Sequence, residues 1–292
     1  RLRMLRVKIQ IKKYMAKQHR TREGEATAVD TKTQLTTCGS DTAPGPLMVP
    51  KGMTFITKIR AAAIQNMAAA TSFSGLIRLE GAGLVGGPQS FAVAAGGAAV
   101  ATGGNAAQYP VEISVNLPVS EGNEVQIFAE MCGTDIGQMG ASVTLEFSDK
   151  AGEGADEHKT ITVEGDLTSV DTRTALTTQG SVTSPSLIVP VGFSKVDKLI
   201  VAAASEGLAD GNSSFLVRLG GNAVLGGEQV LTVGAAGRIA PQSGSDSAPQ
   251  NVSSTVYEDL DIPVSGGDTI SFWGEMAGVD TGTGRLVVTA VF

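Results

Sequence analysis

The chain has 292 residues, of which 42% are apolar, 4% are aromatic and 37 residues are glycine, and its formal net charge is −7. It contains no apolar run of about 18 residues, the length that a membrane-spanning helix requires. Its only histidines are His19 and His158, and its only cysteines are Cys38 and Cys132. This set is too small for a zinc site, a histidine-metal cluster or a histidine-activated nucleophile, and we expect both cysteines to be free thiols.

The first 22 residues are strongly basic. They hold nine of the 22 lysines and arginines and no acidic residue, so the other 270 residues carry 13 basic and 29 acidic side chains. The basic residues of this arm are Arg1, Arg3, Arg6, Lys8, Lys12, Lys13, Lys17, Arg20 and Arg22. A basic arm ahead of an acidic body commonly binds nucleic acid, an anionic membrane surface or an acidic partner. We expect this arm to contact an anionic layer or to dock on a neighbouring subunit.

The apolar residues of the arm fit two kinds of secondary structure. Met4, Val7 and Ile11 follow a helical spacing, whereas the stretch LRVKIQIK at 5–12 alternates as a strand does. The periodicity does not decide between the two, and we predict a helix over 2–18.

The rest of the chain contains one domain sequence twice. VDTKTQLTTCGS at 29–40 returns as VDTRTALTTQGS at 170–181. Further blocks match in the same order, namely 47–53 with 187–193, 75–93 with 215–233, and 117–137 with 262–282. Collinear copies of this length suit whole domains. We therefore predict a basic arm at 1–22, a first domain at 23–150, a polar linker at 151–159 and a second domain at 160–292.

Apolar residues within each copy recur with a period of two, which is typical of strands. We predict strands in the first copy near 31–37, 54–63, 75–80, 89–94, 111–117, 124–130 and 141–147. Their counterparts in the second copy are near 172–178, 194–203, 215–220, 228–233, 255–262, 268–274 and 285–292. Glycine, proline, asparagine and aspartate separate these runs. The expected fold is all-β, with two tandem antiparallel jelly-roll or β-sandwich domains from an internal duplication.

Two charged positions recur inside apolar strands. Arg78 and Arg218 stand in LIRLEG and LVRLGG, and Glu130 and Glu275 stand in AEMCG and GEMAG. Because an unpaired charge in an apolar strand is costly, we predict structural ion pairs Arg78–Glu130 and Arg218–Glu275 across neighbouring strands. The alternative is that each side chain faces solvent on the outer side of its sheet.

Catalytic and metal-binding motifs are not apparent. A carboxylate pair for glycoside hydrolysis is possible in principle, but the aromatic platforms that sugar sites use are scarce, with one tryptophan, Trp273. Asp135 and Asp280 recur in turns, and one aspartate in each loop falls far short of a calcium site. We therefore predict no enzyme activity, no cofactor, no metal and no small-molecule substrate.

The order of these parts resembles that of the double jelly-roll major capsid proteins of tailless, icosahedral, membrane-containing viruses. The resemblance rests on two collinear jelly-roll-like units, each ending in a strand such as VTLEF (143–147) or VTAVF (288–292), after a short basic segment. It implies a homotrimer whose six barrels form a pseudo-hexagonal tile, assembled in the host cytoplasm and located in the virion shell. It also implies that residues 1–22 lie beneath the shell, near an internal membrane or other virion proteins. The close similarity of the two copies departs from the family, whose barrels have generally diverged.

Two other classes of protein remain open. One is another self-assembling surface protein, such as a surface-layer, filament or virion decoration subunit. The other is a tandem binding module for glycans or protein ligands, which the scarcity of aromatic residues disfavours.

Overall fold

The computed structural model describes residues 17–66, 73–96, 105–107, 111–133, 138–152, 157–206, 212–237, 250–278 and 284–292. Every regular element in these ranges is a β-strand, so the predicted all-β fold is confirmed. No helix in the same ranges has the length and apolar character needed to cross a membrane.

The first domain is a sandwich of two antiparallel sheets. One sheet has the order β1 (Lys17–Ala26), β9 (Gln138–Ser148), β3 (Phe55–Asn66), β6 (Asn105–Ala107), with β7 (Val111–Pro118) also paired with β3. The other has the order β2 (Thr33–Gln34), β8 (Gln126–Gly133), β4 (Phe73–Glu80), β5 (Gln89–Gly96). These two strand orders are those of a jelly roll.

The second domain repeats this topology. Its first sheet has the order β10 (Thr160–Leu167), β19 (Gly284–Val291), β13 (Lys198–Glu206), β16 (Gln250–Tyr257). Its second sheet has the order β11 (Thr174–Ala175), β18 (Ser271–Gly278), β14 (Asn212–Gly220), β15 (Gln229–Gly237). A short pair, β12 (Lys195–Val196) and β17 (Ile262–Pro263), completes the domain.

The agreement between the domains extends to local backbone detail. Strand β4 shifts register against β5 between Gly75 and Leu76, and β14 shifts against β15 between Phe215 and Leu216. These positions are equivalent in the two repeats. The repeated phrase also folds in the same way twice, because its aspartates Asp30 and Asp171 have φ angles of 49° and 52°.

Strands β1 and β10 are absent from the sequence prediction. Strand β1 begins at Lys17 and pairs with β9 along its length, so residues 17–22 belong to the first domain rather than to a preceding arm. The helix predicted over 2–18 is wrong at 17 and 18, and its residues 2–16 lie outside the described ranges. The period of two was hidden because the buried positions of β1 are Arg22 and Ala26 rather than a run of large apolar residues.

The described ends of the predicted linker at 151–159 are held against the first domain. The Gly152 amide donates to Asn116 Oδ1 at 2.8 Å. The Asn116 amide in turn donates to His158 Nδ1 at 3.2 Å. Both ends of the connection therefore attach to β7, which fixes where the second domain begins.

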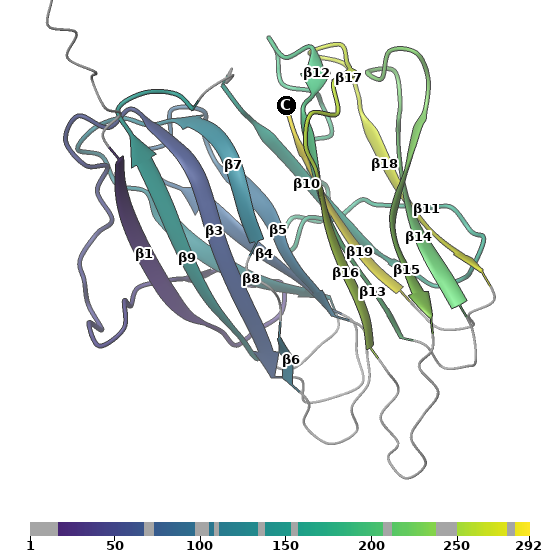
Figure 1. Ribbon diagram of the computed structural model, residues 1–292, viewed down its shortest axis with the longest axis horizontal. Coiled ribbons are helices and arrows are strands. Elements are labelled where there is room, and N and C mark those ends of the chain that lie inside the picture. The colour runs from purple at the N-terminus through teal and green to yellow at the C-terminus, as the bar shows by residue number, and fades with distance from the viewer. Residues whose placement is uncertain are drawn as a thin grey trace, which may run out of the picture.

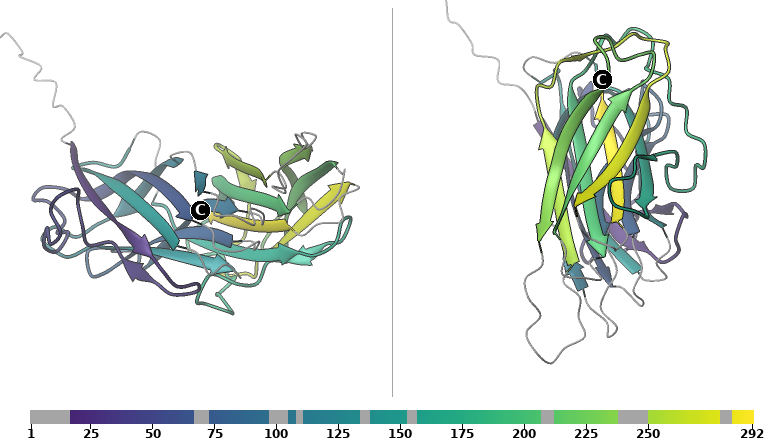
Figure 2. Two further views of the ribbon diagram at one scale, coloured as in Figure 1. Left: turned by 90° about the horizontal axis from the view of Figure 1, so that it is seen from below. Right: turned by 90° about the vertical axis from the view of Figure 1, so that its right-hand side faces the viewer.

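The two sandwiches lie side by side, with their strands running in about the same direction (Figures 1 and 2). Each has its own apolar core. The core of the first domain also takes in four residues from the outward face of β13 and β19, namely Ile200, Ala202, Val287 and Val291. Apolar packing therefore continues from one domain into the other.

Candidate functional site: the contact between the two domains

Strand β5 is an edge strand of the first domain, and it packs on the outward face of the second domain's β10, β19 and β13 (Figure 1). An edge strand presents unpaired amides and carbonyls. Threonine hydroxyls of the second domain bind these groups. The Ser90 amide donates to Thr160 Oγ1 at 3.1 Å, Thr162 Oγ1 donates to the Ser90 carbonyl at 2.8 Å, and the Ala92 amide donates to Thr289 Oγ1 at 2.9 Å. The edge is therefore closed to any further strand.

The Arg78–Glu130 pair lies in the same contact. Arg78 Nε donates to Glu130 Oε2 between β4 and β8, and the two side chains are 8% and 0% exposed. A buried ion pair is tolerated only when its remaining polar atoms are also satisfied. The second domain supplies those partners, because Arg78 Nη2 donates to the Gln179 carbonyl at 2.7 Å and the Ser181 amide donates to Glu130 Oε1.

A glycine makes this approach possible. Gly180 lies between the two residues that bind the ion pair, with φ +55°, and a Cβ added there would lie 2.5 Å from the Glu130 carboxylate. Both the left-handed backbone and the missing side chain are therefore needed at this position.

A second buried charge cluster lies beside the first. Glu164 accepts hydrogen bonds from Ser74 Oγ of the first domain and from the Gly180 amide at 2.8 Å. Arg285 pairs with Glu164 at 3.0 Å and with Asp166 at 2.9 Å. Burial lowers the pKa of Arg285, but Glu164 and Asp166 outweigh it and the pKa is raised. The guanidinium therefore stays charged and balances the buried carboxylate.

Cys132 contributes a thiol to this region. Its ligand atom lies within 4.8 Å of those of Asp30 and Glu164. Burial is the main cause that raises the pKa of Cys132 well above its usual value, followed by Glu164 and Glu130. In the absence of a bound cation the Cys132 thiol is therefore held in its protonated form.

The second domain contains its own Arg–Glu pair in a more open setting. Arg218 Nη2 lies 2.7 Å from Glu275 Oε2, between β14 and β18, and the side chains are 23% and 16% exposed. Arg218 also binds Glu228 at 3.1 Å. The sequence allowed either an ion pair or a solvent-facing arginine at this position, and Arg218 is both paired with Glu275 and partly exposed to solvent.

Three basic residues of the predicted arm are described, and all three lie in β1. Lys17 Nζ binds Glu146 at 2.7 Å, and the exposed Arg20 donates to the His19 carbonyl at 3.0 Å. Arg22 is buried and donates to the Gly45 carbonyl at 2.8 Å. Lys17 and Arg22 therefore bind other parts of the first domain, whereas the Arg20 side chain bonds to its neighbours in β1. Arg1, Arg3, Arg6, Lys8, Lys12 and Lys13 lie outside the described residues.

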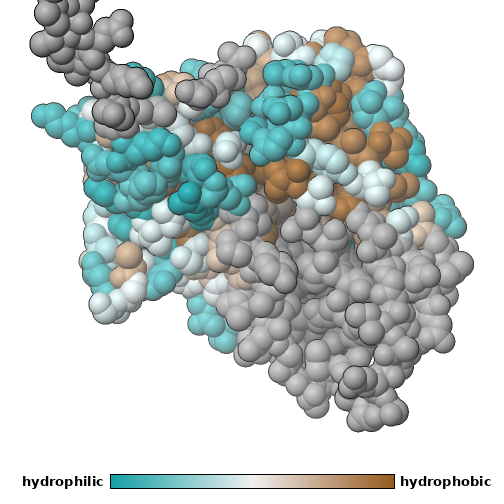
Figure 3. All heavy atoms as spheres, in the orientation of Figure 1, coloured by the Kyte–Doolittle hydropathy of each residue, from teal (hydrophilic) through white to brown (hydrophobic). Residues whose placement is uncertain are grey.

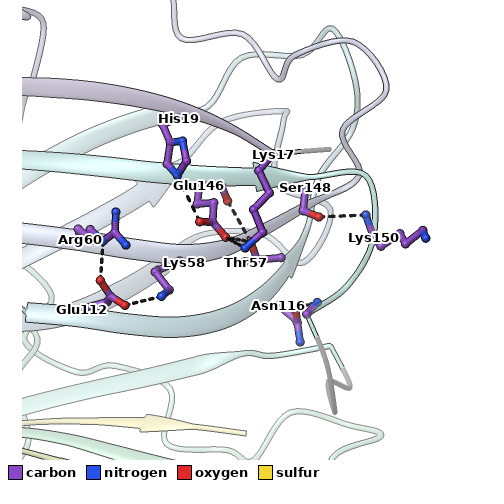
Figure 4. Close-up of polar contacts among 11 residues, drawn as sticks. Lys17, His19, Thr57, Lys58, Arg60, Glu112, Asn116, Glu146, Ser148 and Lys150 are labelled. Atoms are coloured by element: carbon purple, nitrogen blue, oxygen red, sulfur yellow. Dashed lines mark hydrogen bonds and ion pairs between the residues drawn. The ribbon is translucent and has the colours of Figure 1, made fainter. Parts of the chain in front are cut away.

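A hydrophilic patch covers the outward face of β1, β9, β3 and β7 (Figure 3). Its charged side chains include Lys17, Lys58, Arg60, Glu112 and Glu146 (Figure 4). At its centre Glu146 accepts hydrogen bonds from Lys17, His19 and Thr57. Burial alone would raise the pKa of Glu146, but these bonds together lower it to about 2. This face is the first domain's counterpart of the face that receives β5 in the second domain.

The threonines at the contact were not identified from the sequence. A signal was nevertheless present, because Thr162 and Thr289 recur as Thr21 and Thr144 in the other copy while most of their neighbours differ. The structure places each pair hydroxyl to hydroxyl, at 2.8 Å and 2.9 Å respectively.

Comparison with known proteins identifies no family. No family model matches the chain, and no curated protein does so. Among solved structures, a chain from "The Triple Jelly Roll Fold and Turret Assembly in an Archaeal Virus" is 12% identical with a TM-score of 0.23, over 94% of this chain and 56% of that one. The chain also spans 60% of a chain from Sulfolobus Turreted Icosahedral Virus.

Two further solved structures match over most of both chains. A chain of Broad Bean Stain Virus is 7% identical, with a TM-score of 0.33, over 99% of this chain and 94% of that one. The tandem CBM22-1-CBM22-2 domain of Paenibacillus barcinonensis Xyn10C is 10% identical, with a TM-score of 0.23, over 94% and 93%. Similarity at this level carries no argument about function, which must come from the geometry of the chain.

Proposed function

We propose that this chain is a structural protein, a major capsid protein that self-assembles as pseudo-hexagonal trimers into an icosahedral shell. The observation that carries the proposal is the closed contact between the domains. Threonine hydroxyls cover the β5 edge, and the buried Arg78–Glu130 pair of the first domain is hydrogen-bonded to backbone groups of the second domain. Two side-by-side barrels are thereby joined as one rigid building block, which is what repeated tiling requires.

The same contact argues against a tandem binding module. Domains that bind ligands one by one are usually joined by an exposed linker and move relative to each other. Here Val287 and Ile200 of the second domain belong to the core of the first. In addition, the Arg173 guanidinium lies 3.8 Å from the ring centroid of Trp273, so a cation already occupies a ring face that a sugar platform would use.

Within this proposal, three copies place six barrels in one tile located in the virion shell, after assembly in the host cytoplasm. Residues 1–16, the part of the basic arm ahead of β1, extend from the tile toward an internal membrane or other virion proteins. Each lysine or arginine near an anionic surface contributes about 1 kcal/mol. The runner-up, another self-assembling surface protein, shares the same building block and differs in the order of its lattice.

Electron microscopy of particles assembled from the purified full chain tests the proposal. Pseudo-hexagonal tiles with threefold symmetry are the expected result. An extended sheet or a filament would instead support the runner-up. A chain that stays monomeric in mass photometry at every concentration and salt condition would contradict both.

Deleting residues 1–16 tests the role assigned to the arm. The deletion leaves β1 complete, so the trimer should persist while shell formation or vesicle binding is lost. Substituting the six basic residues of this segment by glutamine keeps its length and should have the same effect. Unchanged shell assembly in both variants would refute the role.

A further inference from the structure

The contact between the domains has a donor half, supplied by the first domain, and an acceptor half, supplied by the second. Each domain contains the equivalents of both halves, so one half of each domain is left unused within the chain. The donor half is the β5 edge with Arg78 and Glu130, and the acceptor half is the threonine-bearing face with the turn at Gly180. We propose that the unused donor half of the second domain docks on the unused acceptor half of the first domain of another copy. This inference rests on the proposed function and specifies the surfaces through which copies join.

The turn and the threonine pair of the unused acceptor half match those of the used half. In the used half, the Gly180 amide donates to Glu164 Oε1 at 2.8 Å. In the first domain, the Gly39 amide donates to Glu23 Oε1 at 2.7 Å, and the φ angles of the two glycines are +59° and +55°. The threonine pairs agree in the same way, as described above. The turn and the face are therefore already shaped before any partner arrives.

The same positions differ sharply in exposure. Thr162 and Thr289 are fully buried, at 0% each, whereas Thr21 and Thr144 remain partly exposed. Gly180 is buried and Gly39 is exposed. A site of the same construction is covered in one domain and open in the other.

The unused donor half is likewise present and exposed at Val230, although the Tyr257 hydroxyl of the same chain donates to the Thr232 carbonyl on this edge. Strand β15 ends its sheet as β5 does. Val230, the counterpart of Ser90, is 47% exposed whereas Ser90 is 4% exposed. The Arg218–Glu275 pair occupies the place of Arg78–Glu130. By analogy with the used contact, Arg218 of one copy should bind the Cys38 carbonyl of the next.

The substitutions between the repeats suit a contact between separately folded chains. Behind β5 the covered face is apolar and includes Ile200 and Val291. Their counterparts in the open face are charged. Arg60 forms an ion pair with Glu112, and Glu146 forms one with Lys17. Interfaces between separately folded chains are more polar than interfaces formed during folding, so this difference is expected of an open face that must remain soluble.

Charges across the proposed contact are complementary. Pro88 lines one pocket together with Thr160 and Ile161 of the used contact. In the unused donor half, Glu228 stands at the position of Pro88. In the unused acceptor half, His19 and Arg20 stand at the positions of Thr160 and Ile161. Glu228, which already pairs with Arg173 and Arg218 of its own chain, would therefore face Arg20 beside His19, and this opposite charge favours the docked orientation.

Such a contact is head-to-tail, because the surfaces that meet are different. Repetition of a head-to-tail contact gives a closed ring if the rotation closes and an open filament if it does not. Because the contact between copies repeats the contact within the chain, domains of both kinds alternate around the ring. A threefold ring of chains then appears as six quasi-equivalent barrels.

A single cysteine substitution tests this geometry. Gln179 Nε2 donates to Ser90 Oγ in the used contact, and the counterparts of these residues are Cys38 and Val230. The exposed Cys38 is a free thiol. In Val230→Cys, a short bis-maleimide should join Cys38 of one copy to residue 230 of the next. Denaturing gels of the assembled protein should show a ladder that stops at the size of the ring.

Two control variants make the result decisive. Cys38→Ser/Val230→Cys should lose the ladder, since it lacks the second thiol. Val191→Cys, at a position that is 84% exposed and outside both halves, should give no ladder. A chain that assembles in the microscope while Val230→Cys stays uncrosslinked would overturn this interface and leave the proposed function standing. Equal crosslinking of Val191→Cys would overturn it too, whereas a chain that never assembles would reject the proposed function itself.

Discussion

The Ala92 amide donates a hydrogen bond to the Thr289 hydroxyl at 2.9 Å, although 197 residues separate them in the chain. The bond joins the edge of one barrel to the face of the other. Since Thr289 also shares a hydrogen bond with Thr162 at 2.8 Å, one hydroxyl holds both the edge strand and the face that covers it.

Thr289→Val should therefore destabilise the chain. Valine keeps the shape of threonine but leaves the buried Ala92 amide without a partner, which costs about 1–3 kcal/mol. Urea unfolding would measure the loss. Thr144→Val is the matched control in the open face, and it should change the stability of the unassembled chain by less than about 0.5 kcal/mol. Equal losses in the two variants would contradict the assigned role of Thr289.

Arg78→Met should be strongly destabilising. It removes the partner of the fully buried Glu130, and breaking a buried pair in this way costs about 3–5 kcal/mol. Arg218→Met removes the equivalent guanidinium from a pair that is only partly buried and should cost much less. Chemical denaturation of both variants measures the difference, and a similar loss in each would show that the burial of the first pair is not what matters.

Gly180→Ala and Gly39→Ala test the close approach at the turn. Both alanines would adopt a left-handed backbone, which costs about 1–2 kcal/mol. Only the Cβ at 180 would also collide with Glu130, 2.5 Å away, because nothing lies within 4 Å of the Cβ position at Gly39. Thermal unfolding of the unassembled chain should therefore show the larger loss for Gly180→Ala. The opposite order would contradict the interdomain geometry.

The pH dependence of stability should carry the signature of Glu146. Hydrogen bonds from Lys17, Thr57 and His19 outweigh the effect of burial and lower the pKa of Glu146 from 4.5 to about 2. Because the folded pKa is the lower one, the ionised form stabilises the fold. This contribution is fully present above about pH 4.5 and is lost as pH falls toward 2. Glu146→Gln should flatten that part of the profile of unfolding free energy, and an unchanged slope would show that other carboxylates dominate it.

The sequence predicted the fold class because period two and glycine-rich turns are local signals. It also suggested that Arg78 pairs with Glu130 on a neighbouring strand, since a charge repeated in both copies of an apolar strand needs a partner, and the two side chains do form an ion pair. Strand β1 escaped prediction because its buried positions include Arg22. Its counterpart β10 begins with the β-branched run TITV at 160–163, a strand signal that the sequence prediction did not use.

The contact between the domains gives no periodic signal in the sequence, but it changes the pattern of apolar residues along β19. Every residue of β19 is buried, whereas buried positions alternate along most of its counterpart β9. A strand that is apolar on both faces is covered on both faces. The loss of alternation in 285–291 therefore marks the face on which the other barrel packs. The threonine hydroxyls that cap β5 cannot be read from such a pattern, because their partners are backbone groups distant in the sequence.

The different coverage of the equivalent edge strands β5 and β15 affects the solubility of the chain. Strand β5 is capped within the chain, whereas its counterpart β15 still ends its sheet without such a cover in an isolated chain. Exposed edges are where soluble β-proteins begin to aggregate. In the proposed ring every such edge is capped, so growth stops when the ring closes. We expect variants whose chains still dock but cannot close the ring to precipitate or form fibres, because each added chain would expose a new β15 edge.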